Sequence, residues 1–157
     1  EETDCGTQGG GRSAIYLENS FVRMDTVSIT DNSYGAFLRS SSGYLTNSTV
    51  TTKCNAIDTN SHLVTNGQTH TFVISDNTIT PTDGAGITAY DGAIVVAERN
   101  TISGSAEGSG FGIRSSFVTA NNNVIGPMED GMACGYMVNQ MCLLKTIPYL
   151  TLQKSQY

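Results

Sequence analysis

Three short stretches of the chain decide its fold: Asp76-Asn77-Thr78-Ile79, Arg99-Asn100-Thr101-Ile102 and Asn122-Asn123-Val124-Ile125. Each carries an asparagine two residues before an isoleucine, and the three asparagines follow one another at intervals of 23 residues. A period of this length is typical of solenoids, in which each repeat stacks on the next. We therefore expect the three side-chain amides to hydrogen-bond from repeat to repeat, in preference to three independent turn asparagines.

Two columns of apolar residues carry this period along most of the chain. The first is a dipeptide of a small and an apolar residue: Ala14-Ile15, Ala36-Phe37, Ala56-Ile57, Gly86-Ile87, Gly112-Ile113 and Ala133-Cys134. The second follows about 15 residues later in each repeat: Ile29, Val50, Ile79, Ile102, Ile125 and Ile147. Because both columns keep step over six repeats, they predict about six stacked coils.

Short segments rich in β-branched and aromatic residues lie between the two columns. They are Phe21-Val22-Arg23-Met24, Tyr44-Leu45-Thr46, Phe72-Val73-Ile74, Ala93-Ile94-Val95-Val96 and Phe117-Val118-Thr119. Each is bounded by Gly, Asn, Asp or Ser, which is typical of strands, so each coil should hold three short strands. One coil cannot bury its apolar side alone. Stacking parallel coils about 4.8 Å apart would complete the hydrogen bonds and build one continuous core.

The run Asn100-Thr101-Ile102, followed by Gly112-Ile113, resembles the repeat of the right-handed parallel β-helix superfamily, the pectate-lyase-like fold. The resemblance covers residues 13 to 126 well. It implies an all-β chain that forms a right-handed parallel β-helix, or β-solenoid. It does not imply one activity, because this fold carries many functions.

Departures from the period divide the chain. We expect a lead-in or cap at residues 1–12, coils at residues 13–133, and a last coil with a C-terminal cap at residues 134–157. Extra residues near Ser61 to Thr69 predict a long loop, and the glycine-rich stretch Ser103 to Gly110 predicts a smaller flexible one. The alternative to capped ends is an excerpt from a longer solenoid whose ends are covered by more coils.

Composition limits the partners and the location. The net charge is −6 with only 8 Lys and Arg, so we expect no nucleic-acid partner. No apolar stretch approaches the roughly 18 residues of a membrane span. The acidic, hydroxyl-rich composition and the start Glu1-Glu2-Thr3-Asp4, which reads like a mature or trimmed end, are typical of exported proteins. We expect an extracellular or cell-surface location.

Four cysteines are present: Cys5, Cys54, Cys134 and Cys142. Their spacing contains no zinc-type CxxC pair. The most local disulfide pairing joins Cys5 to Cys54 and Cys134 to Cys142, provided that the compartment is oxidising. The alternative is four buried thiols, which behave as small apolar residues.

Alternation along the first strand of each coil predicts which residues face outward. They are Tyr16 and Glu18, Leu38 and Ser40, Asp58 and Asn60, Thr88 and Tyr90, and Arg114 and Ser116. Arg39 would then face inward, which signals a bent strand or an error of register. The central part of this face is the candidate site, because acidic, aromatic and guanidinium groups on adjacent coils suit a sugar or a uronate.

Candidate roles follow from these residue types. Tyr90, Asn60 and His62, the last on the long loop, are substrate-binding candidates, and Asp58, Asp91 and Arg114 are catalytic candidates. Two carboxylates are what a glycoside hydrolase needs. The resemblance implies that in a lyase Arg114 would act as base, and Asp58 as a ligand of calcium. Apart from that calcium, we expect no cofactor and no other metal.

Two classes of function remain open. The first is a non-enzymatic structural or binding module of an adhesin-like or envelope-like kind, with a polysaccharide or a cell-surface molecule as partner. It fits a repeat-dominated sequence without a catalytic motif. The second is a polysaccharide-active enzyme, either a uronate lyase or a glycoside hydrolase, or a fragment of one. End-to-end self-association is a further expectation, because open solenoid ends offer contacts that need not close.

Overall fold

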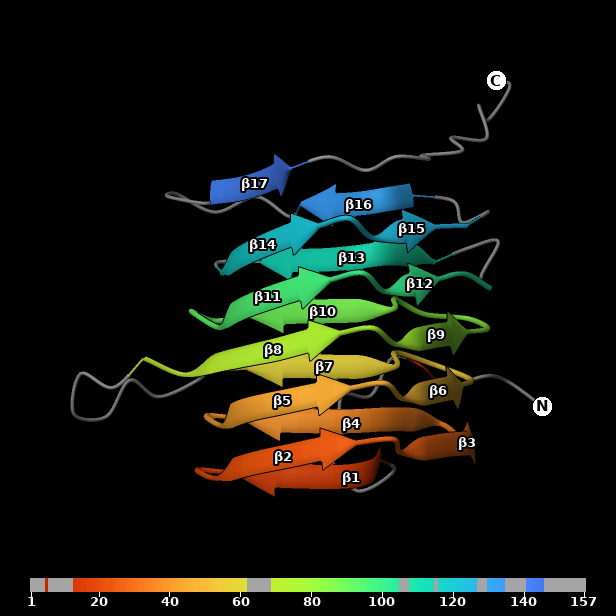
Figure 1. Ribbon diagram of the computed structural model, residues 1–157, viewed down its shortest axis with the longest axis horizontal. Helices are drawn as coiled ribbons and strands as arrows, with labels where there is room; N and C mark the ends of the chain where they lie inside the picture. Colours follow the sequence, from red (N-terminus) through yellow and green to blue (C-terminus); the bar gives the residue numbers. More distant parts are fainter. Residues whose placement is uncertain are drawn as a thin grey trace.

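The chain winds into a stack of parallel coils, seen from the side in Figure 1, a computed structural model. The structure describes residue 5 and residues 13–61, 69–104, 108–114, 116–126, 130–134 and 141–145; of residues 31, 32, 130–134 and 141–145 the backbone alone is described. Every strand pairs with its neighbours in parallel, one coil apart. The expected parallel β-helix is therefore confirmed.

Three sheets run the length of the stack. Sheet A holds the first strand of each coil: β1 (Ser13–Glu18), β4 (Tyr34–Arg39), β7 (Ile57–Asn60), β10 (Ile87–Tyr90), β13 (Ser109–Arg114) and β16 (Asp130–Cys134). Sheet B holds the second strand: β2 (Phe21–Asp25), β5 (Ser42–Thr46), β8 (Thr71–Ser75), β11 (Ile94–Glu98), β14 (Phe117–Asn121) and β17 (Met141–Lys145). Sheet C holds the third: β3 (Ser28–Asn32), β6 (Thr49–Thr52), β9 (Thr78–Pro81), β12 (Thr101–Ile102) and β15 (Val124–Ile125).

These strands group into coils, numbered from coil 1 (β1 to β3) to coil 6 (β16 and β17). Among the described residues, coils 1 to 5 have all three strands and coil 6 has two, so the number of complete coils is slightly below the expected six. Strand β16 crosses the expected boundary between residues 133 and 134. The expected loop at Ser103 to Gly110 ends earlier, because β13 begins at Ser109. The stretch 62–68, which makes up most of the other expected loop, lies outside the described residues.

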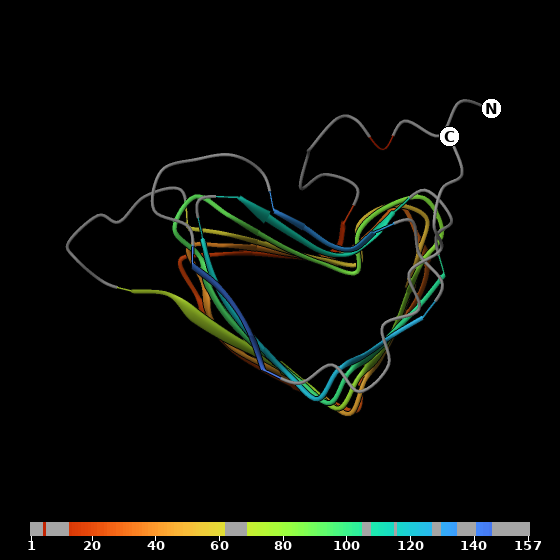
Figure 2. The same cartoon turned by 90° about the horizontal axis from the view of Figure 1, so that it is seen from above.

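The core fills the space that the three sheets enclose (Figure 2). Its most regular part is the second apolar column, which runs through sheet C as Ile29, Val50, Ile79, Ile102 and Ile125. All five side chains are buried, between 0% and 4% exposed. This column is confirmed as the sequence predicts it for these five residues, and Ile147 lies outside the described part of the chain.

The expected first column is wrong in three coils. In sheet A, Ile15 pairs with Ala36 and Ile87 with Phe111, and Phe111 pairs with Met132. The residues expected there, Phe37, Ile113 and Cys134, therefore stand one or two positions too far along. The cause is that Gly35-Ala36, Gly110-Phe111 and Gly131-Met132 are small-apolar dipeptides as well. A shift by one residue moves a side chain to the other face of its strand.

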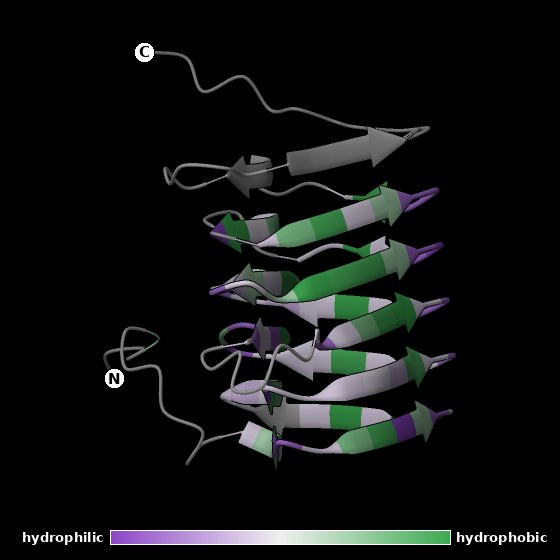
Figure 3. Cartoon of the chain, turned by 90° about the vertical axis from the view of Figure 1, so that its left-hand side faces the viewer, coloured by the Kyte–Doolittle hydropathy of each residue, from purple (hydrophilic) through white to green (hydrophobic). Residues whose placement is uncertain are grey.

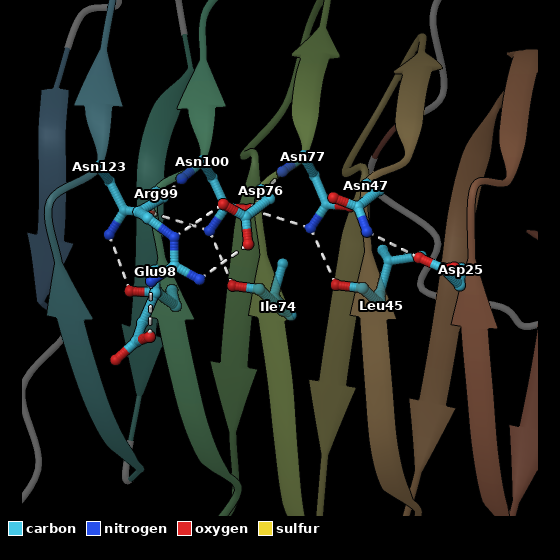
Figure 4. Close-up of polar contacts among 11 residues, drawn as sticks. Asp25, Leu45, Asn47, Ile74, Asp76, Asn77, Glu98, Arg99, Asn100 and Asn123 are labelled. Atoms are coloured by element: carbon cyan, nitrogen blue, oxygen red, sulfur yellow. Dashed lines mark hydrogen bonds and ion pairs between the residues drawn. The ribbon is translucent and has the colours of Figure 1, made fainter.

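The asparagine ladder is present and buried (Figure 4). The side-chain oxygen of Asn123 accepts hydrogen bonds from the backbone and the side-chain amide of Asn100, each at 2.9 Å. Asn100 accepts the equivalent pair from Asn77. The side-chain oxygen of Asn77 then accepts the backbone N–H of Ser48, whose hydroxyl accepts the N–H of Val27. The ladder thus joins coils 1 to 5 at one corner.

Left-handed backbone turns the chain at the same place in successive coils. Five residues each follow a strand of sheet B and have positive φ: Thr26 (56°), Asn47 (50°), Asp76 (59°), Arg99 (53°) and Asn122 (54°). These turns form a stacked hydrophilic edge, drawn in purple at the ends of the strands in Figure 3. Apart from glycine, Asn and Asp tolerate this conformation best, so the sequence suits the corner in three of the five coils.

A disulfide joins Cys5 to Cys54, with an S–S distance of 2.03 Å, so this part of the expected pairing is confirmed. The hydroxyl of Tyr34 donates a 2.8 Å hydrogen bond to the carbonyl of Cys5, which fixes this residue beside coil 2. The side chains of Cys134 and Cys142 lie outside the described part of the structure, so their pairing stays a prediction.

Candidate functional site

The candidate site lies on the outer face of sheet A, over coils 3 to 5. Asn60 of β7, Tyr90 of β10 and Arg114 of β13 are register partners on three adjacent strands. Their side chains therefore succeed one another along the solenoid axis, about 4.8 Å apart at the backbone. The sequence predicts all three on this face, and the register brings them together in one row, which we call the outer row.

Asp58 stands two residues before Asn60 and is also on the outer face of β7, but it is only 4% exposed. Its register partners are Phe37 and Thr88. The side-chain amide of Asn55 donates to Oδ1 of Asp58 at 2.9 Å, and the hydroxyl of Thr88 donates to the same oxygen. Burial raises the pKa of Asp58, and these two hydrogen bonds oppose that rise. Such burial keeps this carboxyl from contacting a substrate freely.

Tyr90 connects the buried carboxyl to the outer row. Burial raises the pKa of its half-buried phenol, and the nearby Asp58 carboxylate raises it further. A hydrogen bond with Thr88 and the positive charge of Arg114 act in the opposite direction, while Tyr34 adds a small rise. These four neighbours come from strands β4, β7, β10 and β13, so Tyr90 is the centre of the cluster.

Asp91 does not pair with Asp58. It follows β10 in a left-handed turn with φ of 52°, is exposed, and accepts a 3.3 Å hydrogen bond from the side chain of Asn60. It stands three residues beyond Thr88, the register partner of Asp58, so the two aspartate backbones are about 10 Å apart along the strand. Each carboxylate is engaged by a different amide. A glycosidase holds its two carboxyl groups roughly 5 to 9.5 Å apart, and the hydrolase roles of Asp58 and Asp91 stay predictions.

The remaining candidates are His62 and a metal ion. His62 lies outside the described residues. Within the described residues no group of three His, Cys, Asp or Glu side chains is close enough to hold a metal ion. Asp58, the proposed calcium ligand, is buried, and one of its oxygens accepts from two donors. Calcium stays a prediction.

The outward face of coil 2 differs from the expectation. Leu38, expected outward, is a core residue at 1% exposure, and Ser40 is also buried. Phe37 faces outward instead and stacks on Tyr16, with ring centroids 5.6 Å apart. Arg39 is on the outer side, where it pairs with Glu18 at 3.6 Å. The cause is the one-residue slip at Gly35-Ala36, which exchanges the two faces of β4.

Ser116 is expected to face outward, but it is buried. It lies beyond the end of β13 and is 2% exposed, with its hydroxyl donating to the carbonyl of Arg114 at 3.0 Å.

The site also contains residues that sequence reasoning missed. Asn55 reaches the site from the turn before β7, and only its hydrogen bond to Asp58 reveals it. The sequence predicts the correct face for Thr88, but the hydrogen bond of its hydroxyl to Asp58 leaves no signal in the sequence.

The fold and the outer row define a parallel β-solenoid with three sheets and one polar face on sheet A. More narrowly, the chain belongs to the right-handed beta helix family. The model of this family, described as "Right handed beta helix region", matches residues 3–140. Comparison with curated proteins and with solved structures gave no match. Within the described residues, no helix is long and apolar enough to cross a membrane.

Proposed function

We propose that this chain is an exported, non-enzymatic binding module that holds a polysaccharide along the outer row of sheet A. The observation that carries the proposal is the register of Asn60, Tyr90 and Arg114 on three successive coils. It offers an amide, an aromatic ring and a guanidinium group in one line parallel to the solenoid axis. A polymer with repeated rings and hydroxyl groups suits such a line better than a compact ligand does.

Each member of the row supplies a different interaction. The ring of Tyr90 offers an apolar surface and a phenol that can hydrogen-bond. Asn60 offers an amide with two donor hydrogens, which also donates to Asp91, whereas its side-chain oxygen is buried without a hydrogen-bond partner among the described residues. Arg114 is exposed, and its planar donors match a carboxylate. The row therefore favours polymers that contain uronate units over neutral ones.

The exported location rests on the disulfide between Cys5 and Cys54. Structural disulfides form and persist in oxidising compartments, outside the cytosol of most cells. The net charge of −6 and the low content of charged residues accord with this location. Cell-surface attachment is the more specific form of the proposal.

A polysaccharide-active enzyme is the second candidate, and one observation favours it. Asp58 is a buried carboxyl with a raised pKa that lies near Tyr90, and Tyr90 lies near Arg114; perturbed groups of this kind cluster at functional sites. In that case Arg114 would take the proton from the sugar ring, and Asp58 would act through Thr88 and Tyr90 by positioning them. We rank it second because Asp58 and Asp91 are engaged by separate partners.

The test is calorimetric titration of the chain with polygalacturonate, alginate and a neutral glucan. We expect binding to a uronate polymer, and a loss of affinity of about tenfold in Tyr90→Ala and in Arg114→Ala. Tyr44→Ala and Arg23→Ala are matched controls, because both residues are exposed on sheet B. Equal losses in the control variants, or no binding at all, would reject the outer row as the binding site.

The same samples decide between module and enzyme. Incubation with each polymer, with and without added calcium, is followed by measurement of chain length and of unsaturated uronate ends. An intact polymer is the expected result. Cleavage that disappears in Arg114→Ala would replace the proposed module by the enzyme.

A further inference from the structure

Among the residues that the structure describes, coil 1 has no further strand on its N-terminal side in any of the three sheets. The described part of sheet A ends on β1, that of sheet B on β2 and that of sheet C on β3, so coil 1 has a neighbour on one side only. Figure 1 shows this coil at the bottom of the stack. The single described residue of the N-terminal segment, Cys5, is fixed to coils 2 and 3 by Tyr34 and Cys54.

The core is partly exposed at the same end. Four apolar side chains pack against the core without being fully buried, and all four belong to coil 1: Ile15, Leu17, Val22 and Val27. Their counterparts one coil further on, such as Ala36 and Leu38, are 2% and 1% exposed. Unpaired strand edges around an exposed apolar interior form a template for pairing with another chain.

The opposite end carries matching residues at every inner position that the register defines. In sheet A the inner column of Ile15 ends at Met132 and that of Leu17 at Cys134. In sheet B the column of Val22 ends at Cys142 and that of Met24 at Leu144. All eight terminal positions are apolar, so the sequence of coil 6 suits a place directly beneath coil 1 of another copy.

Charge adds to this match. The outer column of sheet B begins at Asp25 in coil 1 and ends at Lys145 in coil 6. Stacking two copies in one direction makes an acidic and a basic residue register partners across the junction. Stacking two N-terminal ends against each other would bring two copies of coil 1 together, and Lys145 would take no part.

We infer that this chain associates head to tail, with β16 and β17 of one copy pairing in parallel with β1 and β2 of the next. The junction would continue the coil-to-coil contact that already repeats inside the chain. The partner is a second copy because β16 and β17 offer apolar residues at the inner positions that would meet coil 1 in sheets A and B. Among the described residues coil 6 has no sheet C strand, so the junction forms through these two sheets. Such a contact does not close on itself, so it adds copies in a line.

The first experiment measures the mass distribution of the full chain by sedimentation velocity over a wide range of concentration. We expect wild type to form growing end-to-end oligomers. Ile15→Lys places a charge in the junction and should weaken association by about tenfold or more. Tyr16→Lys is the matched control, because this neighbour is 43% exposed on the outer face of the same strand, and it should leave association unchanged.

The second experiment exchanges the charges at the junction. Asp25→Lys and Lys145→Asp should each weaken association by a few fold, and the double variant should restore it. Circular dichroism checks that every variant is folded, and this pair decides the question if Ile15→Lys is not. A wild-type monomer at all concentrations overturns the inference. Equal weakening by Tyr16→Lys, or a double variant no better than the singles, also overturns it.

Discussion

The side-chain oxygen of Asn100 accepts two hydrogen bonds from Asn77, one from its backbone N–H at 3.1 Å and one from its side-chain amide at 2.9 Å. The amide of Asn100 in turn donates to the carbonyl of Ile74 at 2.8 Å and to the side chain of Asn123 at 2.9 Å. Asn100 is 1% exposed, so water cannot replace these bonds. The side chain of Asn100 in coil 4 thereby bonds to polar groups of the coils on either side of it.

Asn100→Ala should lower the free energy of unfolding by about 3 kcal/mol or more, because it leaves several buried polar groups without partners. Urea denaturation followed by circular dichroism measures the change. Thr101→Ala, at the exposed next position, is the control and should stay within about 0.5 kcal/mol of wild type. If the two substitutions lower the free energy of unfolding equally, the hydrogen bonds of the ladder do not stabilise the fold beyond an ordinary surface contact.

Thr26→Asn should raise the free energy of unfolding by roughly 0.5 to 1 kcal/mol. Thr26 has φ of 56°, a region that β-branched residues rarely adopt, whereas asparagine tolerates it and already occupies the equivalent corner at Asn47. Thermal melts of the two proteins measure the difference. Thr49→Asn, in the exposed part of β6, is the matched control and should not stabilise. A lower melting temperature for Thr26→Asn contradicts the expectation.

Asp58→Asn should become more stabilising relative to wild type as the pH rises from acid to neutral. The folded-state pKa of Asp58 lies above its ordinary value of 3.8 because of burial. Below 3.8 the carboxyl is neutral in both states. As the pH rises toward the folded pKa, the unfolded chain loses the proton first, so the free energy of unfolding of wild type falls. Asparagine removes this loss while an oxygen remains to accept from Asn55 and Thr88.

Urea denaturation of both proteins at several pH values measures this difference. A range of roughly pH 3 to 7 covers the titration of carboxyl groups. Asp76→Asn is the control of opposite sign, because the hydrogen bond and charge of Arg99 lower the pKa of Asp76. That carboxylate stabilises the fold above its ordinary pKa and loses this effect as the pH falls. If the free energies of unfolding of Asp58→Asn and wild type differ by the same amount at every pH, ionisation of the buried Asp58 carboxyl does not destabilise the fold.

Replacing Cys5 and Cys54 together by alanine should lower the free energy of unfolding by up to about 4 kcal/mol. The disulfide closes a loop of 49 residues, and chain entropy in the unfolded state sets this magnitude. Denaturant titration of the double variant beside wild type measures it. Tyr34→Phe, which removes the hydrogen bond from the Tyr34 hydroxyl to the Cys5 carbonyl and keeps the disulfide, should cost about 1 kcal/mol.

The sequence predicts the fold from the positions where identity and spacing coincide. The asparagines and the isoleucines of sheet C recur with both residue type and interval intact, so their register is unambiguous. In sheet A, the core position is filled by residues as different as Ala36 and Phe111, and small residues occur on both sides of it. Pattern alone then allows a slip of one residue, which is why Leu38 was placed on the wrong face.

The candidate site was predictable in part for a related reason. Asn60, Tyr90 and Arg114 were found because outward positions follow from alternation once the register of their strands is correct. The burial of Asp58 was not, since Asn55 and Thr88 enclose it from the preceding turn and from the next coil. Contacts between separate coils leave no periodic trace in the sequence.

The ladder has a consequence for how such a chain can change its length. Asn77 and Asn100 occupy identical places in successive coils, so removal of residues 78–100 would join two equivalent corners and let Asn77 meet Asn123. Gene duplication or deletion can therefore add or remove a whole coil while the buried columns keep their register. The outer row has no such freedom. It belongs to three particular coils, and the same deletion would remove Tyr90 and leave the scaffold standing.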